Sequence, residues 1–210
     1  MKSTIKVKII LSLVFLTLIF TGCKSTGQIK DSANFYYKNQ SRKISNIGRI
    51  AIVELQNDSS YPQMSSDITE ALFQSLQKKQ IFGLSIVRQR DPLWKSLQLE
   101  PDTTYTLDQM ATIRQTLKYD GVLIGTITEF KPYPHTSVGL RLKLIDLTTG
   151  DLLWAIEQVW NGSDKITEQK IKKYFKETKS SSADDSNERI AAISPLEFIK
   201  FVSYEVAQTL

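Results

Sequence analysis

The chain has 210 residues, with 27 basic and 22 acidic side chains, one histidine and one cysteine. Three of the basic residues, Lys2, Lys6 and Lys8, lie in an N-terminal segment without acidic residues, so the formal net charge of +5 falls by three to +2 when that segment is removed. This small charge does not indicate nucleic acid as a partner. The single cysteine excludes an intramolecular disulfide, so the folded part must be stable through its core alone.

Residues 1–22 have the pattern of a secretory signal peptide. The three lysines precede an uncharged, mostly apolar run, Ile9–Phe20. About a dozen residues in a helix rise about 18 Å, which is too short for the ~30 Å hydrocarbon core of a membrane. A positive start, a short apolar run and small residues at its end are typical of a secretion signal.

The segment Thr21-Gly22-Cys23 resembles the lipobox of bacterial lipoproteins, in which small residues precede a cysteine. Phe20 stands where that family usually has leucine. The resemblance implies that cleavage between Gly22 and Cys23 leaves Cys23 as the first residue. Its thiol then carries a diacylglycerol and holds the protein at a lipid bilayer. The alternatives are an ordinary cleaved signal with an incidental cysteine, and an uncleaved anchor.

Lys24 and Ser25 follow the cysteine. In the lipoproteins that the segment resembles, an acidic residue here favours retention at the inner membrane. The resemblance therefore implies a lipid anchor at the outer membrane, with the domain facing the periplasm. In a cell without an outer membrane, the anchor would lie on the outer face of the cell membrane.

Residues 23–46 are predicted to form a lipidated tether, because they are polar and show no sustained period. The aromatic cluster Phe35-Tyr36-Tyr37 interrupts the tether. We expect these rings to pack onto the edge of the domain; a partner-binding segment is the alternative.

Residues 47–161 are predicted to form an α/β domain. Short apolar runs or alternating patterns indicate five strands, at 50–55, 84–87, 121–127 with an extension to 130, 138–146 and 152–160. Apolar residues at helical spacing follow Asp67 and Thr106, and Glu70 and Gln109 stand three residues later as capping partners. The order β-α-β-α-β-β-β predicts a mixed sheet with packed helices, and a turn at 148–151 joins the last two strands.

The composition of the remaining residues differs from that of the predicted domain. Residues 162–192 form a polar insertion in which 166–177 are compatible with a lysine-rich amphipathic helix. Residues 193–210 predict a C-terminal helix, with Ser194 as N-cap and Pro195 in the first turn. Its apolar face, which includes Val202, has nowhere else to pack, so we expect the helix to dock on the domain.

Three segments resemble one group of bacterial envelope proteins over roughly residues 48–161. Ile50–Asn57 is similar to the first strand of that group, Leu117–Gly125 to a leucine, small residue, aspartate and glycine segment at its third strand, and Leu144–Trp154 to its closing hairpin. The group includes the lipoprotein of the curli secretion channel, penicillin-binding-protein activator lipoproteins, an exopolysaccharide-export lipoprotein and the TolB N-terminal domain. The resemblance implies an anticodon-binding-domain-like fold used for protein–protein contact and assembly.

Catalytic chemistry is not indicated by the sequence. The single histidine, His135, lies on a proline-bounded loop without a nucleophile-elbow pattern nearby. No spacing of cysteine, histidine or carboxylate residues predicts a metal site, and no glycine-rich loop predicts a phosphate or a nucleotide cofactor. Four strand-end carboxylates are the remaining candidates for an acid–base pair, Glu54, Asp58, Asp120 and Glu129. We expect a protein that is not an enzyme and has no metal or cofactor.

The function expected is that of an accessory or assembly lipoprotein of the envelope, acting in secretion, polysaccharide export or cell-wall synthesis. Its partners would be envelope proteins, a second copy of the chain included. Two loops are candidate contact surfaces, one with Arg88, Arg90 and Trp94, the other with Tyr133 and His135. The alternative for Trp94 is a place in the core. The alternative functions are a subunit of an oligomeric outer-membrane secretion channel and, third, an envelope hydrolase or ligand-binding lipoprotein.

The substitution Cys23→Ser tests the anchor. Because the thiol is the acyl acceptor, the variant should remain an unprocessed precursor that takes up no radioactive palmitate, whereas the unchanged chain is labelled. Absence of label from the unchanged chain would refute the lipoprotein assignment.

Overall fold

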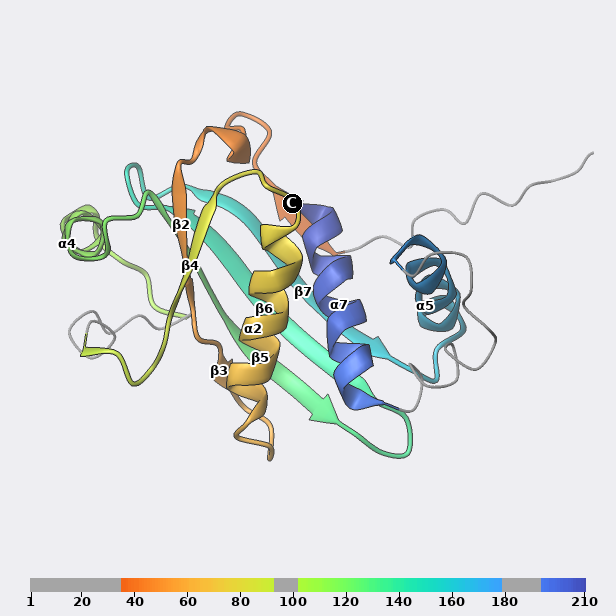
Figure 1. Ribbon diagram of the computed structural model, residues 1–210. Coiled ribbons are helices and arrows are strands. Elements are labelled where there is room, and N and C mark those ends of the chain that lie inside the picture. Colours follow the sequence, from red (N-terminus) through yellow and green to blue (C-terminus); the bar gives the residue numbers. More distant parts are fainter. Residues whose placement is uncertain (1–34, 93–101, 179–193) are drawn as a thin grey trace, which may run out of the picture. The chain divides into compact units, whose positions relative to one another are not determined.

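The computed structural model describes residues 35–92, 102–178 and 194–210 (Figure 1). The predicted signal peptide, Gly22, Cys23 and Trp94 lie outside these ranges, as do residues 179–192 of the polar insertion. Within the described ranges, no helix has both the length and the apolar character needed to cross a membrane.

A mixed seven-stranded sheet forms the centre of the domain. Its strands are β1 (Tyr36–Lys38), β2 (Arg49–Val53), β3 (Gln56–Asn57), β4 (Gly83–Val87), β5 (Gly121–Lys131), β6 (Ser137–Asp146) and β7 (Leu152–Asn161). The spatial order is β1-β7-β6-β5-β2-β4, and β3 also pairs with β5. β2 is parallel to β4 and β5, whereas β6 and β7 are antiparallel to both of their neighbours. The predicted fold class is confirmed.

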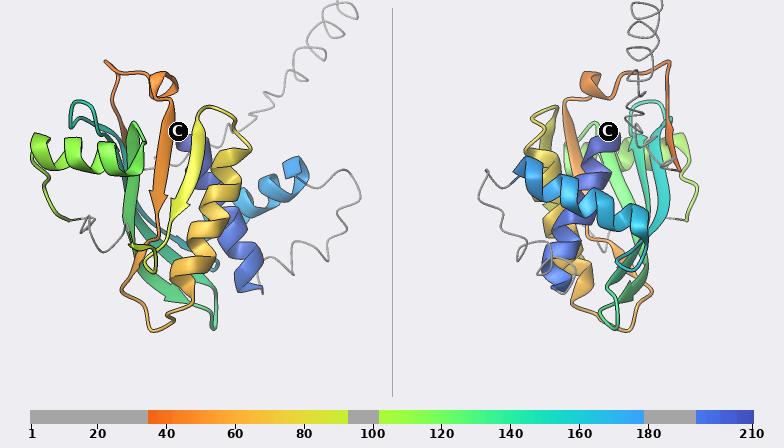
Figure 2. Two further views of the ribbon diagram at one scale, coloured as in Figure 1. Left: turned by 60° about the vertical axis from the view of Figure 1, so that its left-hand side comes forward. Right: turned by 90° about the vertical axis from the view of Figure 1, so that its right-hand side faces the viewer.

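Helices cover both faces of this sheet. They are the 3-10 helix η2 (Ile44–Asn46) and the α-helices α2 (Met64–Gln77), α4 (Leu107–Leu117), α5 (Lys165–Thr178) and α7 (Pro195–Thr209). α2 and α7 lie side by side on one face, and α4 lies on the other (Figures 1 and 2). α5 packs against α7 on the side away from α2.

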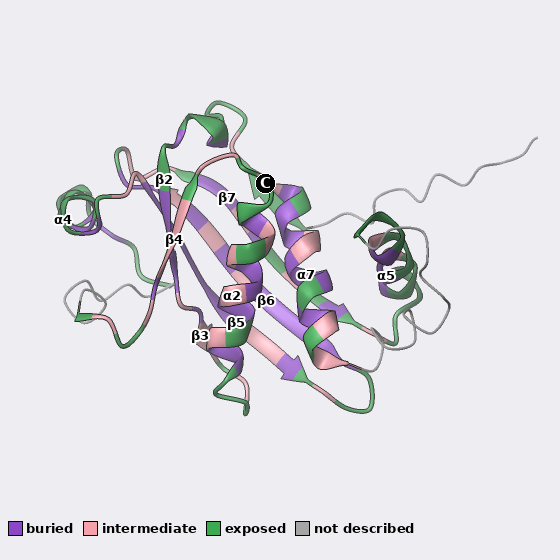
Figure 3. Cartoon of the chain, in the orientation of Figure 1, coloured by how far each residue is buried: buried purple, intermediate pink, exposed green. Residues whose placement is uncertain are grey.

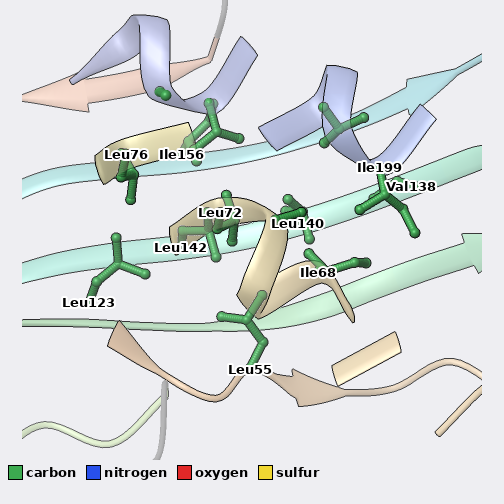
Figure 4. Packing of buried hydrophobic residues seen from close by; sticks show 14 of the residues in the cluster. Leu55, Ile68, Leu72, Leu76, Leu123, Val138, Leu140, Leu142, Ile156 and Ile199 are labelled. Atoms are coloured by element: carbon green, nitrogen blue, oxygen red, sulfur yellow. The ribbon is translucent and has the colours of Figure 1, made fainter. Parts of the chain in front are cut away.

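Strand β6 shows how the sequence pattern places the core. Its even-numbered apolar residues from Val138 to Leu144 are fully buried under α2 and α7, whereas Arg141 and Lys143 lie on the opposite face and are partly exposed (Figures 3 and 4). The alternation follows from the two-residue period of a strand. Each buried aliphatic side chain contributes roughly 1.5–3 kcal/mol of transfer free energy, so the paired helices and this strand form the main core.

Helix α2 begins three residues before the predicted cap. Its N-cap is Gln63, whose side chain makes no capping hydrogen bond, and Asp67 lies inside the helix. Two hydroxyl groups of its N-terminal half bond to the backbone of Leu55, since the Ser65 hydroxyl donates to the carbonyl oxygen and the Leu55 N–H donates to Thr69 Oγ1 at 3.0 Å. These bonds join the segment between β2 and β3 to the helix, and the predicted Asp67 capping box does not form. The Thr106–Gln109 capping box of α4 does form, as predicted.

Part of the segment assigned to the tether belongs to the folded domain. Residues 36–38 form β1, which pairs with β7, and Ile44 is buried in the main core. Arg42 lies between them and bonds to the hairpin after β6, with Nη1 2.9 Å from Asp146 Oδ2 and Nε 3.3 Å from Asp151 Oδ2. Strand pairing and these ion contacts therefore place residues 36–44 in the folded domain.

Two glycines are required by the backbone. A Cβ at Gly125 would lie 2.4 Å from the Arg141 carbonyl oxygen on the neighbouring strand, which no side chain can accommodate without a shift. Gly150 has a φ of +79° in the turn between β6 and β7, a conformation that favours glycine. The close match of the sequence to a hairpin at this turn thus has a structural explanation.

The C-terminal helix α7 completes the core, as predicted. Val202 is 1% exposed, and Trp154 of β7 donates from Nε1 to Thr209 Oγ1 at 3.1 Å, which ties the end of the helix to the sheet. Pro195 occupies the first turn, and Ser194 precedes it without a side-chain capping bond.

The substitution Val202→Asp should destabilise the domain by about 3 kcal/mol or more, because it buries a carboxyl group among apolar side chains. Urea denaturation followed by circular dichroism measures the loss. Leu196→Asp on the same helix is the control, because Leu196 is 55% exposed and the change should cost less than about 1 kcal/mol. Equal stability of Val202→Asp and the unchanged chain would show that α7 is not part of the core.

Candidate functional site

The loop between β5 and β6 carries two of the predicted contact residues. Tyr133 is 78% exposed, and His135 is also exposed. Tyr133 lines an open cleft of about 430 Å³, together with the segment Asp58–Tyr61 after β3 and residues 128–132. The Tyr61 ring packs edge-on against the Phe130 ring, with centroids 5.2 Å apart, and thereby fixes the floor of the cleft.

Glu129 is the most strongly held charged group of this cleft. After a shift in the β5–β6 register, Glu129 is paired with Gly139, two residues from Ser137 on the same strand. The Ser137 hydroxyl donates to Glu129 Oε1, and Lys131 Nζ lies 2.9 Å from Oε2. These two contacts lower the pKa of Glu129 below its usual range, and the hydrogen bond from Ser137 has the larger effect. Burial acts in the opposite direction but is weaker. The group is therefore a fixed carboxylate at neutral pH and not a proton donor.

The four candidate carboxylates do not gather at one place. Asp58 and Glu129 line the same cleft. Glu54 instead accepts a hydrogen bond from the Gln89 N–H at 2.7 Å, and Asp120 lies 3.3 Å from Arg114 Nη2. Across residues 35–92, 102–178 and 194–210, no three histidine, cysteine or acidic side chains are placed to hold a metal ion. The cleft therefore presents hydroxyl groups, aromatic rings and the Glu129 carboxylate to a bound molecule.

The other predicted contact surface is only partly available. Arg88 directly follows β4, and its guanidinium contacts α2, with Nη2 3.2 Å from Glu70 Oε2 and Nη1 3.3 Å from the Ser66 hydroxyl. This arginine therefore fixes the loop after β4 to the domain. Arg90 is exposed. Trp94 lies outside the described residues, so its place in the core or on the surface stays a prediction.

Strand β1 presents an aromatic surface that differs from the expectation. Its backbone pairs with β7, as packing onto the domain edge requires, but the rings of Phe35, Tyr36 and Tyr37 are 78%, 44% and 50% exposed. The sequence contained a signal for this outcome. Successive residues of a strand point to opposite faces, so three consecutive aromatic rings cannot all pack on one side.

Helix α5 presents a second surface, which is basic. It contains five lysines and two glutamates, and Thr167, Ile171 and Phe175 form its buried side. Tyr174 stacks obliquely on Tyr204 of α7, with centroids 5.0 Å apart. The Tyr204 hydroxyl donates to Glu177, and burial followed by this carboxylate raises the pKa of Tyr204 to about 12. Aromatic contacts therefore fix the helix, and four of its five lysines are exposed, Lys170 being the exception.

Neither a protein-family model nor a curated protein matches the chain. Several solved structures are similar to it. A PelC dodecamer from Paraburkholderia phytofirmans is 15% identical, with a TM-score of 0.44 over 60% of this chain and 80% of that one. Lipoprotein GNA1162 from Neisseria meningitidis is 16% identical, with a TM-score of 0.41 over 65% and 99%. The LpoB C-terminal domain from Salmonella enterica is 20% identical, with a TM-score of 0.38 over 54% and 82%. The likeness to each is one of fold, over part of this chain.

The substitution Glu129→Gln should show a pH-dependent loss of stability. A lowered pKa in the folded state stabilises the fold above the pKa of the unfolded carboxyl, and this contribution disappears as the pH falls through the folded value. Near neutral pH the variant should be less stable by about 1 kcal/mol or less, since Lys131 is solvent-screened.

Urea denaturation near pH 7 and near pH 3 measures this difference, which should shrink at the lower pH. Ser137→Ala is the matched control. It removes the hydroxyl group that is the main cause of the lowered pKa of Glu129, and it keeps the carboxylate itself. A difference of the same size at both pH values would contradict the assignment of Glu129 as a fixed carboxylate.

Proposed function

We propose that this chain is a bacterial envelope lipoprotein, anchored at the outer membrane through acylated Cys23, that binds envelope proteins as an accessory or assembly factor. The sequence pattern of residues 1–23 supports the anchor. The observation that carries the binding role is the exposed aromatic edge of the sheet at β1, since aromatic residues are enriched where proteins bind one another.

Strand β1 is an edge to which another strand can be added. β7 lies on one side of it, and among the described residues no strand pairs with the other side. The outer backbone groups of an edge strand are a template for an extended segment of another chain. In this mode of recognition, backbone hydrogen bonds provide affinity and side-chain contacts provide specificity.

The register of β1 places aromatic rings on both faces of such an interface. Tyr36 is opposite Ile156, on the face that carries α7, and Tyr37 is opposite Ala155, on the other face. Lys38 is held by its own domain, because Nζ donates to the Leu210 carbonyl oxygen at 2.6 Å. An added segment would therefore contact one tyrosine on each side of the sheet, and we propose an extended segment of another envelope protein as the occupant.

The double substitution Tyr36→Ser with Tyr37→Ser should abolish partner capture. Both tyrosines are about half exposed and lie outside the core, so the free energy of unfolding should change by no more than about 1 kcal/mol. Photo-crosslinking in cells from a benzophenone residue at position 35, with mass spectrometry of the products, measures capture in the unchanged and the doubly substituted background.

Tyr133→Ser is the control, because it removes a more exposed tyrosine from a different loop and should leave the crosslinks unchanged. Products that persist in the double variant would show that β1 is not the contact. Products that contain only this chain would show self-association at this edge in place of a different partner.

A further inference from the structure

The lysines of α5 form one continuous outer face. At about 100° per residue, Lys165, Lys172, Lys173 and Lys176 fall within an arc of about 100°. All four side chains are exposed, and Gln169 lies within the same arc. Ile166, which is 44% exposed, adjoins this lysine face in the first turn.

This lysine face holds the positive charge of the domain. The fourteen residues of α5 carry five lysines and two glutamates, a net charge of +3. The other described residues carry 14 basic and 15 acidic side chains, a net charge of −1. The domain therefore has a localised positive surface and not a general excess of charge.

Most of the lysine face is not used in ion pairs. Lys170, outside this arc, lies 2.8 Å from Glu205 of α7, and Lys172 lies 3.2 Å from Glu168. Lys165, Lys173 and Lys176 form no ion pair with another described residue. Three ammonium groups are therefore available to an anionic partner.

The lysine face and the start of the domain lie on the same edge of the sheet. The Glu157 N–H of β7 donates to the Phe35 carbonyl oxygen at 3.4 Å, and α5 begins shortly after β7 ends. Figure 2 shows α5 crossing this edge, on the opposite side of the domain from α4. Phe35 is 12 residues after Cys23, so the anchor lies within about 43 Å of it even when the chain is fully extended.

We infer that the lysine face of α5 contacts an anionic phospholipid surface and thereby orients the domain on the bilayer. The inference rests on the proposed lipid anchor, which brings this edge near the headgroups. Lysine side chains near anionic lipids are attracted electrostatically, and the attraction falls off within a Debye length. A polybasic patch beside an acyl chain is a second membrane signal of this kind.

The test uses the full lipidated chain, purified from membranes and reconstituted into vesicles. A single cysteine is introduced at Gln169→Cys on the lysine face or at Gln115→Cys on α4, both of which replace an exposed glutamine. The cysteine carries a fluorescent donor, and a lipid with an acceptor on its headgroup reports proximity. Vesicles consist of phosphatidylcholine alone, or with phosphatidylglycerol as about a third of the lipid.

Energy transfer from position 169 should exceed that from position 115 in the anionic vesicles only. It should be lost at about 1 M NaCl, where the Debye length is about 3 Å. It should also be lost in the variant Lys165→Gln, Lys173→Gln, Lys176→Gln, which removes the unpaired charges and keeps the buried side of the helix.

Equal transfer from position 169 in neutral and anionic vesicles would overturn the inference. Unchanged energy transfer in the triple variant would also overturn the inference. The same holds if the triple variant changes only the binding of a purified anionic wall polymer. The unmodified chain distinguishes failure of this inference from failure of the proposed lipid anchor, because Cys23 is its only cysteine and is blocked when acylated. Reaction of the unmodified chain with a maleimide dye would refute the anchor itself.

Discussion

The packing of α2 against α7 over one face of the sheet is the interaction on which the other features depend. The two helices enclose the largest set of buried side chains, including Leu72 and Phe198. The end of α7 also contacts β1 and α5, which carry the two proposed contact surfaces. Leu210 accepts the hydrogen bond from Lys38 of β1, and Glu205 pairs with Lys170 of α5. Both proposed contact surfaces are thus positioned by the same helix, and loss of its packing would displace them together.

Much of the fold could be predicted because its signals are local. The alternation around Leu140 on β6, the capping box at Thr106 and the turn at Gly150 each depend on residues within a few positions of one another. The start of α2 and strand β1 depend on distant contacts. Hydroxyls of α2 bind Leu55, and a three-residue strand has no period of its own but exists because β7 pairs with it. Tertiary contacts of this kind override local propensity.

The candidate site was less predictable, for a related reason. Residue type alone indicated Arg88 as a contact, but the pairing with Glu70 is visible only when α2 and the loop after β4 are placed together. The hydrogen bond from Ser137 to Glu129 likewise depends on the pairing of β5 with β6, which places Glu129 opposite Gly139. Exposure of Tyr133 was predictable because prolines flank it in a loop, and loops lie on the surface.

The separation of α2 and α7 along the chain has a consequence for folding. The helices occupy residues 64–77 and 195–209, so their contact closes a loop of more than a hundred residues. Closing such a loop costs conformational entropy before the packing compensates for it, and high contact order slows folding. Local units such as the β6–β7 hairpin should therefore form early, and the apolar side of α2 should stay open until the last helix arrives. The interval before that closure is when the chain is most exposed to proteases and to aggregation.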